Sequence, residues 1–120
     1  MTKQNNAVGA YGERLACRYL LDLGYEVLAQ NWRCPQGEID IVATDPQGNL
    51  AIVEVKTRRT DDRGTGAQAV TSSKLARLRR LCAVWLGEHP HHGRVRIDVI
   101  SILLPLRGTP AIDHFTGVAW

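Results

Sequence analysis

Two charged side chains occur inside a stretch that otherwise predicts a buried strand. The segment IVEVKTRR, residues 52–59, begins with β-branched apolar residues, yet it carries Glu54 and Lys56 two positions apart. Because side chains alternate between the faces of a strand, both charges share one face, and Val53 and Val55 share the other. An ion pair on an exposed sheet face would explain such a pair taken alone. The acidic residues elsewhere in the chain favour a different explanation.

Three more carboxylates accompany this pair. In GEIDIV, Glu38 and Asp40 are expected to share a strand face, with Ile39 and Ile41 on the other. Glu13 lies at the edge of the apolar stripe of a preceding helix, and packing of that stripe would bring it towards the strand carboxylates. Like charges in a poorly hydrated place each cost several kcal/mol unless they are paired or bound to a metal. Hard oxygen ligands of this kind select Mg²⁺ or Mn²⁺ over zinc.

Lys56 fits such a site as a catalytic group. An ammonium beside a metal-bound water can position that water and stabilise negative charge that develops on a phosphate. Carboxylates, a divalent ion and a lysine on one hairpin are together what phosphodiester hydrolysis requires. With Asp40 upstream and Glu13 on a preceding helix, we interpret Glu54 and Lys56 as parts of this site.

The elements that would position these residues form a mixed α/β pattern. Apolar periodicity and turn residues predict a helix over 9–23 and strands over 25–29, 37–45 and 50–58. After a polar stretch over 60–70, which predicts a mobile loop, they predict a helix with its N-cap at Thr71 and strands over 94–104 and 111–120. The order αβββαββ predicts one α/β domain over 1–120, a mixed β-sheet flanked by helices.

Five stretches, in order along nearly the whole chain, resemble a known family. They are GERLACRYL (12–20), NWRCPQGEIDIV (31–42), VEVKTR (53–58), AVTSSK (69–74) and RIDVI (96–100). The chain is similar to the YraN family of bacterial endonuclease-like proteins, within the PD-(D/E)xK nuclease superfamily, and to archaeal Holliday-junction resolvases. The resemblance implies a restriction-endonuclease-like core in which Asp40, Glu54 and the backbone carbonyl of Val55 bind the metal. It also implies that Lys56 is the catalytic lysine and Glu13 an accessory helical carboxylate.

One position departs from the superfamily pattern. The proline that precedes the aspartate is Ile39 here, and Glu38 comes one residue earlier. Glu38 therefore stays open between a metal ligand and a partner of the ligands.

Arginine supplies most of the positive charge. The chain has 12 Arg, 3 Lys and a formal net charge of +3, which favours an anionic partner because guanidinium groups match phosphate oxygens. A coding bias would give the same composition. Arg58 and Arg59 directly follow the candidate strand, and Lys74 and Arg77 are expected on the polar side of the second helix. Such a strip would hold a nucleic-acid backbone without reading bases; a solvated helix face is the alternative.

Three functions from different classes compete. The first is a Mg²⁺-dependent (or Mn²⁺-dependent) endonuclease that hydrolyses DNA, including branched DNA. The second is a non-catalytic nucleic-acid-binding module on a nuclease fold, and the third is a structural partner that uses the sheet edge at 111–117. Intact carboxylates and lysine favour the first over the second. The sequence leaves open whether the protein forms a homodimer.

Other residues predict a cytoplasmic protein with ordinary packing. No segment has the length of a membrane span, and the N-terminal stretch lacks the apolar region of a signal peptide. The three cysteines form no paired motif, so a reduced compartment is expected. We expect Cys17 and Cys82 to be buried and Asp98 to pair with Arg94 or Arg96. We expect Trp32 and Trp85 to be packing residues. The histidines at 89–92 are expected to lie at the end of a helix and not to bind zinc.

Overall fold

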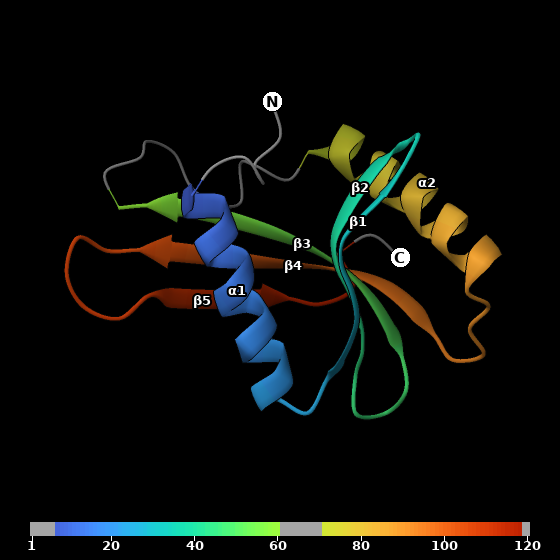
Figure 1. Cartoon of the computed structure of the whole chain (residues 1–120), viewed down its shortest axis with the longest axis horizontal. Helices are drawn as coiled ribbons and strands as arrows, with labels where there is room; N and C mark the ends of the chain where they lie inside the picture. Colours follow the sequence, from blue (N-terminus) through green and yellow to red (C-terminus); the bar gives the residue numbers. More distant parts are fainter. Residues whose placement is uncertain (1–6, 61–70, 119–120) are drawn as a thin grey trace.

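The computed structural model describes residues 7–60 and 71–118, which form two helices and five strands (Figure 1). In chain order these are α1 Ala7–Asp22, β1 Glu26–Cys34, β2 Gly37–Thr44, β3 Leu50–Arg59, α2 Ser72–Glu88, β4 Val95–Leu104 and β5 Ala111–Phe115. The loop predicted over 60–70 lies outside the described residues except for Thr60. The predicted N-cap of α2 is confirmed, because Oγ1 of Thr71 accepts a hydrogen bond from the Lys74 amide at 3.2 Å.

The strands form one mixed sheet in the order β1-β2-β3-β4-β5. Neighbours are antiparallel except β3 and β4, which are parallel. The parallel pair follows from the connection, because α2 lies between these strands in the chain and a parallel pair needs such a crossover. The predicted α/β class, mixed sheet and element order are confirmed, with β2 and β3 as inner strands.

Each face of the sheet buries a separate apolar cluster. Figure 1 shows α1 lying across β3, β4 and β5, whereas α2 lies beside the β1–β2 hairpin at the other end of the molecule. The buried cluster under α1 contains Ala16, Leu20, Ile41, Ala43, Ala51, Val53, Val55, Ile100 and Ile102. The buried cluster under α2 contains Ile39, Val42, Leu50, Ile52, Leu78, Leu81, Cys82, Trp85 and Ile97. Together they anchor β2 and β3 from both sides, so the candidate site stands on the most buried part of the sheet.

The first strand is longer than predicted, and the alternation along β2 is not regular. β1 continues to Cys34, although a strand was expected only over 25–29. Asn31 has a positive φ of 51°, and the register between β1 and β2 shifts between Val27 and Ala29. Ile39 and Ile41 of β2 pack in opposite clusters. The prediction that they share one face was wrong, because the regular alternation of a strand does not hold between these two residues.

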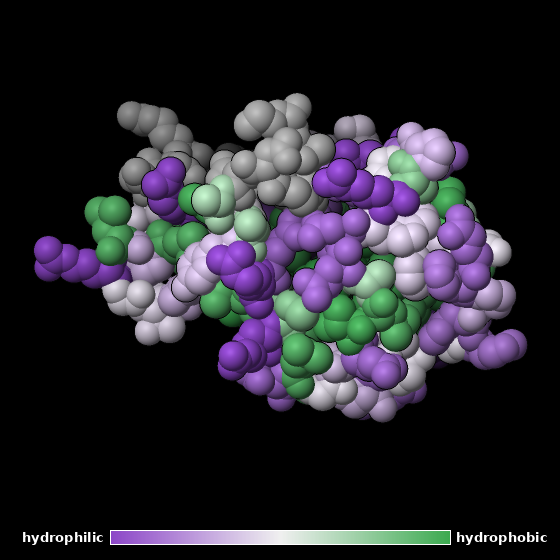
Figure 2. Space-filling view, viewed as in Figure 1, coloured by the Kyte–Doolittle hydropathy of each residue, from purple (hydrophilic) through white to green (hydrophobic). Residues whose placement is uncertain are grey.

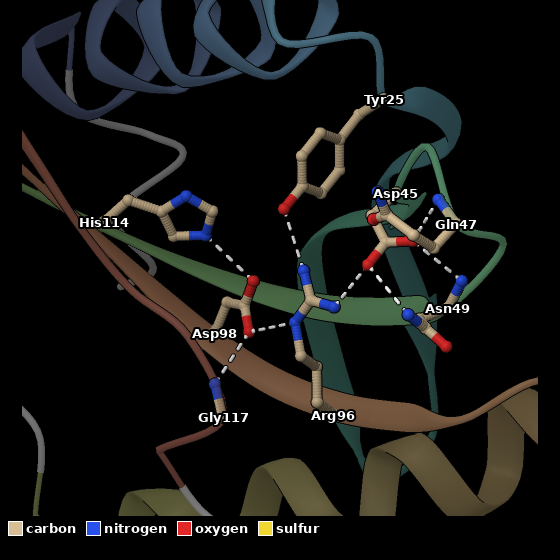
Figure 3. A network of polar contacts seen from close by, with 8 residues as sticks. All are labelled: Tyr25, Asp45, Gln47, Asn49, Arg96, Asp98, His114 and Gly117. Atoms are coloured by element: carbon tan, nitrogen blue, oxygen red, sulfur yellow. Dashed lines mark hydrogen bonds and ion pairs between the residues drawn. The ribbon is translucent and has the colours of Figure 1, made fainter.

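A buried polar network ties the sheet to the β2–β3 turn (Figure 3). Arg96 binds Asp98 through Nε at 2.9 Å and Asp45 through a terminal nitrogen at 2.6 Å. Asp98, which is fully buried, also accepts from the Gly117 amide at 3.0 Å and contacts Nε2 of His114 at 2.8 Å. Arg96 is thus the predicted partner of Asp98. The contacts of Arg96 with Asp45 and Tyr25, and of Asp98 with His114 and Gly117, join residues 16 to 71 positions apart, which no local pattern indicates.

The predicted packing is confirmed for Trp32, Trp85 and Cys82 but not for Cys17. Trp32 and Trp85 do pack together, edge to face at 5.5 Å between ring centroids, and His89 stacks on Trp85 at 3.7 Å. Cys82 is buried, but Cys17 is only half-buried because it lies at the side of the α1 stripe. No helix in the described part of the chain is long and apolar enough to cross a membrane.

Candidate active site

The candidate site begins where β2 separates from β3. The paired residues of these strands end at Ile41 and Val53. One step further, Oδ2 of Asp40 accepts the backbone N–H of Val55 at 2.8 Å. The Asp40 side chain is 1% exposed, so a buried carboxylate fills the fork between two inner strands.

Glu54 and Lys56 stand next to this fork on β3. Continuing the antiparallel register by one pair places Glu54 opposite Asp40. Val53 and Val55 pack under α1, so alternation directs Glu54 and Lys56 to the opposite face. Glu54 is 7% exposed and Lys56 is half-buried. The expectation that both charges share one face of a buried strand is therefore consistent with the packing of the valines.

Glu13 reaches the same region from α1. The helix approaches β3 closely at Gly12, where an added Cβ would lie 1.8 Å from Oγ1 of Thr57. This contact positions the next residue, Glu13, which is 6% exposed. Glu13 lines a pocket of about 170 Å³ with Gln30 and Asn31 of β1. Glu13 therefore approaches the sheet from the α1 face, whereas alternation directs Glu54 and Lys56 to the other face of β3.

The donor set suits a hard divalent cation. Among residues 7–60 and 71–118, no three or more His, Cys, Asp and Glu side chains form a group that could hold a metal. Mg²⁺ does not need such a group, because it usually keeps several waters and takes only one or two carboxylates. Asp40 and Glu54, both buried at the end of the β2–β3 pairing, supply that number. They fit magnesium or manganese better than zinc.

The predicted basic strip divides into two groups. Arg58 and Arg59 lie at the end of β3, with Arg58 half-buried and Arg59 exposed. Lys74 and Arg77 belong to α2 and are both half-buried. Arg77 turns towards Gly37 at the tip of the β1–β2 hairpin, where its Cδ would lie 4.0 Å from an added Cβ. The candidate carboxylates and lysine are thus flanked by basic residues along β3 and at the hairpin tip.

Glu38 pairs with an arginine. Its Oε2 lies 3.2 Å from Nε of Arg33 across the β1–β2 hairpin. Ile39, between Glu38 and Asp40, packs under α2. The ion pair with Arg33 favours the role of partner over that of metal ligand for Glu38.

Comparison with known proteins identifies the family. The model described as uncharacterised protein family UPF0102 matches residues 12–102. The chain belongs to UPF0102. This is the YraN family, so the resemblance seen in the sequence is confirmed. The UPF0102 protein of Kineococcus radiotolerans is 50% identical over 98% of this chain and 97% of its own. That of Beutenbergia cavernae is 51% identical over 97% and 98%, respectively.

Two solved structures are similar to parts of this UPF0102 chain. One is a repair endonuclease from Pyrococcus abyssi, with a TM-score of 0.44 and 13% identity over 75% of this chain and 34% of that one. The other is EndoMS in a complex with double-stranded DNA, with a TM-score of 0.45 and 16% identity over 81% and 38%. The chain spans less than two fifths of either protein.

Sequence reasoning missed residues that shape the site without being charged carboxylates. Gly12 is required by the close approach of α1 to Thr57, and Asn31, which lines the pocket beside Glu13, has a positive φ. Asn is one of the few residue types enriched at positive φ, so its position between two strand-like stretches was the one available indication. The glycine resembles any other helical residue until the partner strand is placed.

Proposed function

We propose that this protein is a Mg²⁺-dependent endonuclease that hydrolyses phosphodiester bonds of DNA. The observation that carries the proposal is the buried Asp40 carboxylate at the β2–β3 fork, which accepts the Val55 amide, with the buried Glu54 one residue earlier on β3. Burying two carboxylates near each other is costly unless they bind a cation. A site that binds a cation gives that arrangement a purpose.

The side chains divide the work of hydrolysis. Asp40, Glu54 and the Val55 carbonyl would hold the ion, which supplies a more acidic water and polarises the phosphate when bound. Lys56, next along β3, orients the attacking water and stabilises negative charge on the phosphate oxygens. Glu13, from the α1 side of the fork, accepts hydrogen bonds from water in the pocket that it lines with Gln30 and Asn31.

The substrate class follows from the charge around the fork. Arg58, Arg59, Lys74 and Arg77 offer donors to phosphates, and phosphate contacts alone give binding with little sequence preference. These basic groups lie on two sides of the site, which suits a nucleic acid whose path changes direction. Branched and junction DNA are therefore the first substrates to test.

Cleavage of labelled duplex, single-stranded, flap and four-way-junction DNA in Mg²⁺ or Mn²⁺ tests the proposal. We expect cleavage by the wild type, and a loss of about 10²- to 10³-fold in Asp40→Asn and Lys56→Ala, the scale of removing one catalytic group. Asp22→Asn, at the exposed end of α1, is the matched control and should keep wild-type activity. Metal-dependent cleavage that survives in Asp40→Asn would contradict the assignment.

The same assay decides the alternative function. Tight DNA binding without cleavage of any substrate, with either metal, would identify a non-catalytic nucleic-acid-binding module on this fold.

A further inference from the structure

A second pocket lies between the tip of the β1–β2 hairpin and α2. Its volume is about 310 Å³, and it is lined by Arg33, Cys34, Pro35, Gly37, Glu38 and Arg77. Figure 2 shows strongly hydrophilic residues over this part of the hairpin, next to the beginning of α2. Gly37 has a φ of 142°, and Leu81 and Arg77 of α2 pack near its Cα. The backbone at the hairpin tip is thereby fixed against the helix.

The charges in this pocket favour an anion. Nε of Arg77 is buried and has no hydrogen-bond partner within the described residues. Arg33 is largely exposed and is restrained by its ion pair with Glu38. Two guanidinium groups and one carboxylate leave a net charge of +1. A buried donor without a partner is costly, and an anion that accepts from it removes that cost.

We propose that this pocket binds a backbone phosphate of the nucleic acid that occupies the candidate active site. Arg77 and Arg33 are its ligands, and Glu38 limits its affinity by holding Arg33 and repelling the phosphate. The proposal rests on the proposed function, because it places one nucleic acid at both the fork and the pocket. Asp40 follows Glu38 by two residues on β2. That separation is roughly 7 Å, which equals about two base-pair steps measured along the axis of a duplex. A strand with one phosphate at the fork would reach the pocket with a nearby one.

Binding of fluorescent DNA in EDTA tests the pocket without any cleavage. Arg77→Gln should weaken binding about tenfold at about 0.1 M salt, as expected for loss of a charged hydrogen bond. It should also flatten the slope of log K against log salt by roughly 0.7 to 0.9. Arg80→Gln, on the exposed side of the same helix, is the matched control and should change either value by less than half as much. Equal effects of Arg77→Gln and Arg80→Gln would overturn the proposal.

Glu38→Gln should change the affinity for DNA in the opposite direction. Removing this carboxylate releases Arg33 and lowers the repulsion, so DNA should bind several-fold more tightly, and the further change Arg33→Gln should cancel the gain. Weaker DNA binding by Glu38→Gln would show that Glu38 does not restrain the pocket.

Cys34 reports occupancy directly because it lines the pocket. In a Cys17→Ser background, with Cys82 buried, the thiol of Cys34 should react more slowly with a thiol reagent when DNA is present. Protection by a short oligonucleotide at micromolar concentration, but by pyrophosphate only at millimolar concentration, would identify a nucleic-acid phosphate as the natural occupant. Equal protection by both would identify a site for free phosphates and overturn the nucleic-acid assignment. No protection by either would overturn the pocket.

The failure of this proposal is distinguishable from failure of the nuclease. If Asp40→Asn abolishes cleavage while Arg77→Gln binds DNA like Arg80→Gln, the pocket is wrong and the active site stands. If the wild type cleaves nothing while Arg77→Gln loses DNA affinity and Cys34 protection, the pocket stands on a non-catalytic binding protein.

Discussion

The Asp40 side chain replaces a backbone acceptor in the sheet. Where β2 leaves β3, the Val55 amide would lose its partner in the ladder, and the Asp40 carboxylate accepts it instead at 2.8 Å. A buried amide without an acceptor would cost about 1–3 kcal/mol. The carboxamide of Asp40→Asn still offers a carbonyl oxygen to that amide, so this variant removes the charge while the fork can persist. Asp40→Ala would remove both.

Glu54 and Lys56 can be separated by their effects on stability. If they serve a site and not each other, Lys56→Ala should change the free energy of unfolding by no more than about 0.5 kcal/mol, as expected for a half-buried side chain outside the core. The charge-swapped double variant Glu54→Lys with Lys56→Glu should be at least as unstable as the sum of its two single changes. Urea unfolding of the four proteins measures this. Recovery of most of the lost stability in the swap would instead indicate a simple ion pair.

At the scale of elements, the local pattern predicted what local chemistry decides. The β2–β3 hairpin followed from β-branched runs and from a turn in which Asp45 accepts the Gln47 and Asn49 amides at 2.9 Å. The cap of α2 followed from Thr71. The second half of β1 could not be predicted, because its polar sequence becomes a strand only by pairing with β2. The position of α1 on β3 depends on Gly12, whose role exists only once Thr57 lies beside it.

Gly12→Ala should therefore destabilise the protein. Alanine gains roughly 1 kcal/mol as a helix former, but its Cβ would lie 2.7 Å from Cβ of Thr57 and closer still to Oγ1. Overpacking of this kind costs about 1–3 kcal/mol, and so close an approach places the cost towards the upper end, so a net loss of up to about 2 kcal/mol is expected. Thermal unfolding measures it, and adding Thr57→Ala should recover part of the loss.

Gly87→Ala is the matched control for this contact. A Cβ at Gly87, near the end of α2, meets nothing within 4 Å. The substitution should raise the free energy of unfolding by about 0.5 kcal/mol through helix propensity alone. Equal stabilisation by Gly12→Ala would mean that α1 does not approach β3 as closely as the structure shows.

At the scale of the whole molecule, the Arg96 network links stability to acid. Burial raises the pKa of Asp45, but hydrogen bonds from Arg96 and Asn49 outweigh it and lower the pKa to about 2. Burial also acts against Asp98, and His114 and Arg96 lower its pKa below the ordinary value. Folded-state pKa values below the unfolded ones mean that this stabilisation is complete above about pH 4 and is lost as the pH falls towards 2.

Asp45→Asn isolates this contribution. It should lower the free energy of unfolding at pH 7 by about 2 kcal/mol, between the values of exposed and buried ion pairs, because Arg96 stays partly solvated. The difference from wild type should shrink below pH 4, where the wild-type carboxylate begins to take up its proton. Urea unfolding between pH 2 and pH 7 measures it, with Asp22→Asn as control. A difference that stays constant down to pH 2 would show that the charge of Asp45 does not contribute to the stability of the fold.

The most direct test of the active-site assignment is titration calorimetry with Mn²⁺, because it requires no knowledge of the substrate. Wild type, Lys56→Ala and Asp22→Asn should each bind the ion at one site, with Lys56→Ala binding as tightly or more tightly because a nearby positive charge is gone. Asp40→Asn and Glu54→Gln should lose that binding while they keep the fold, and only the binding-competent proteins should gain thermal stability from the ion. Wild-type affinity for Mn²⁺ in Asp40→Asn and Glu54→Gln would contradict a metal site at the fork between β2 and β3.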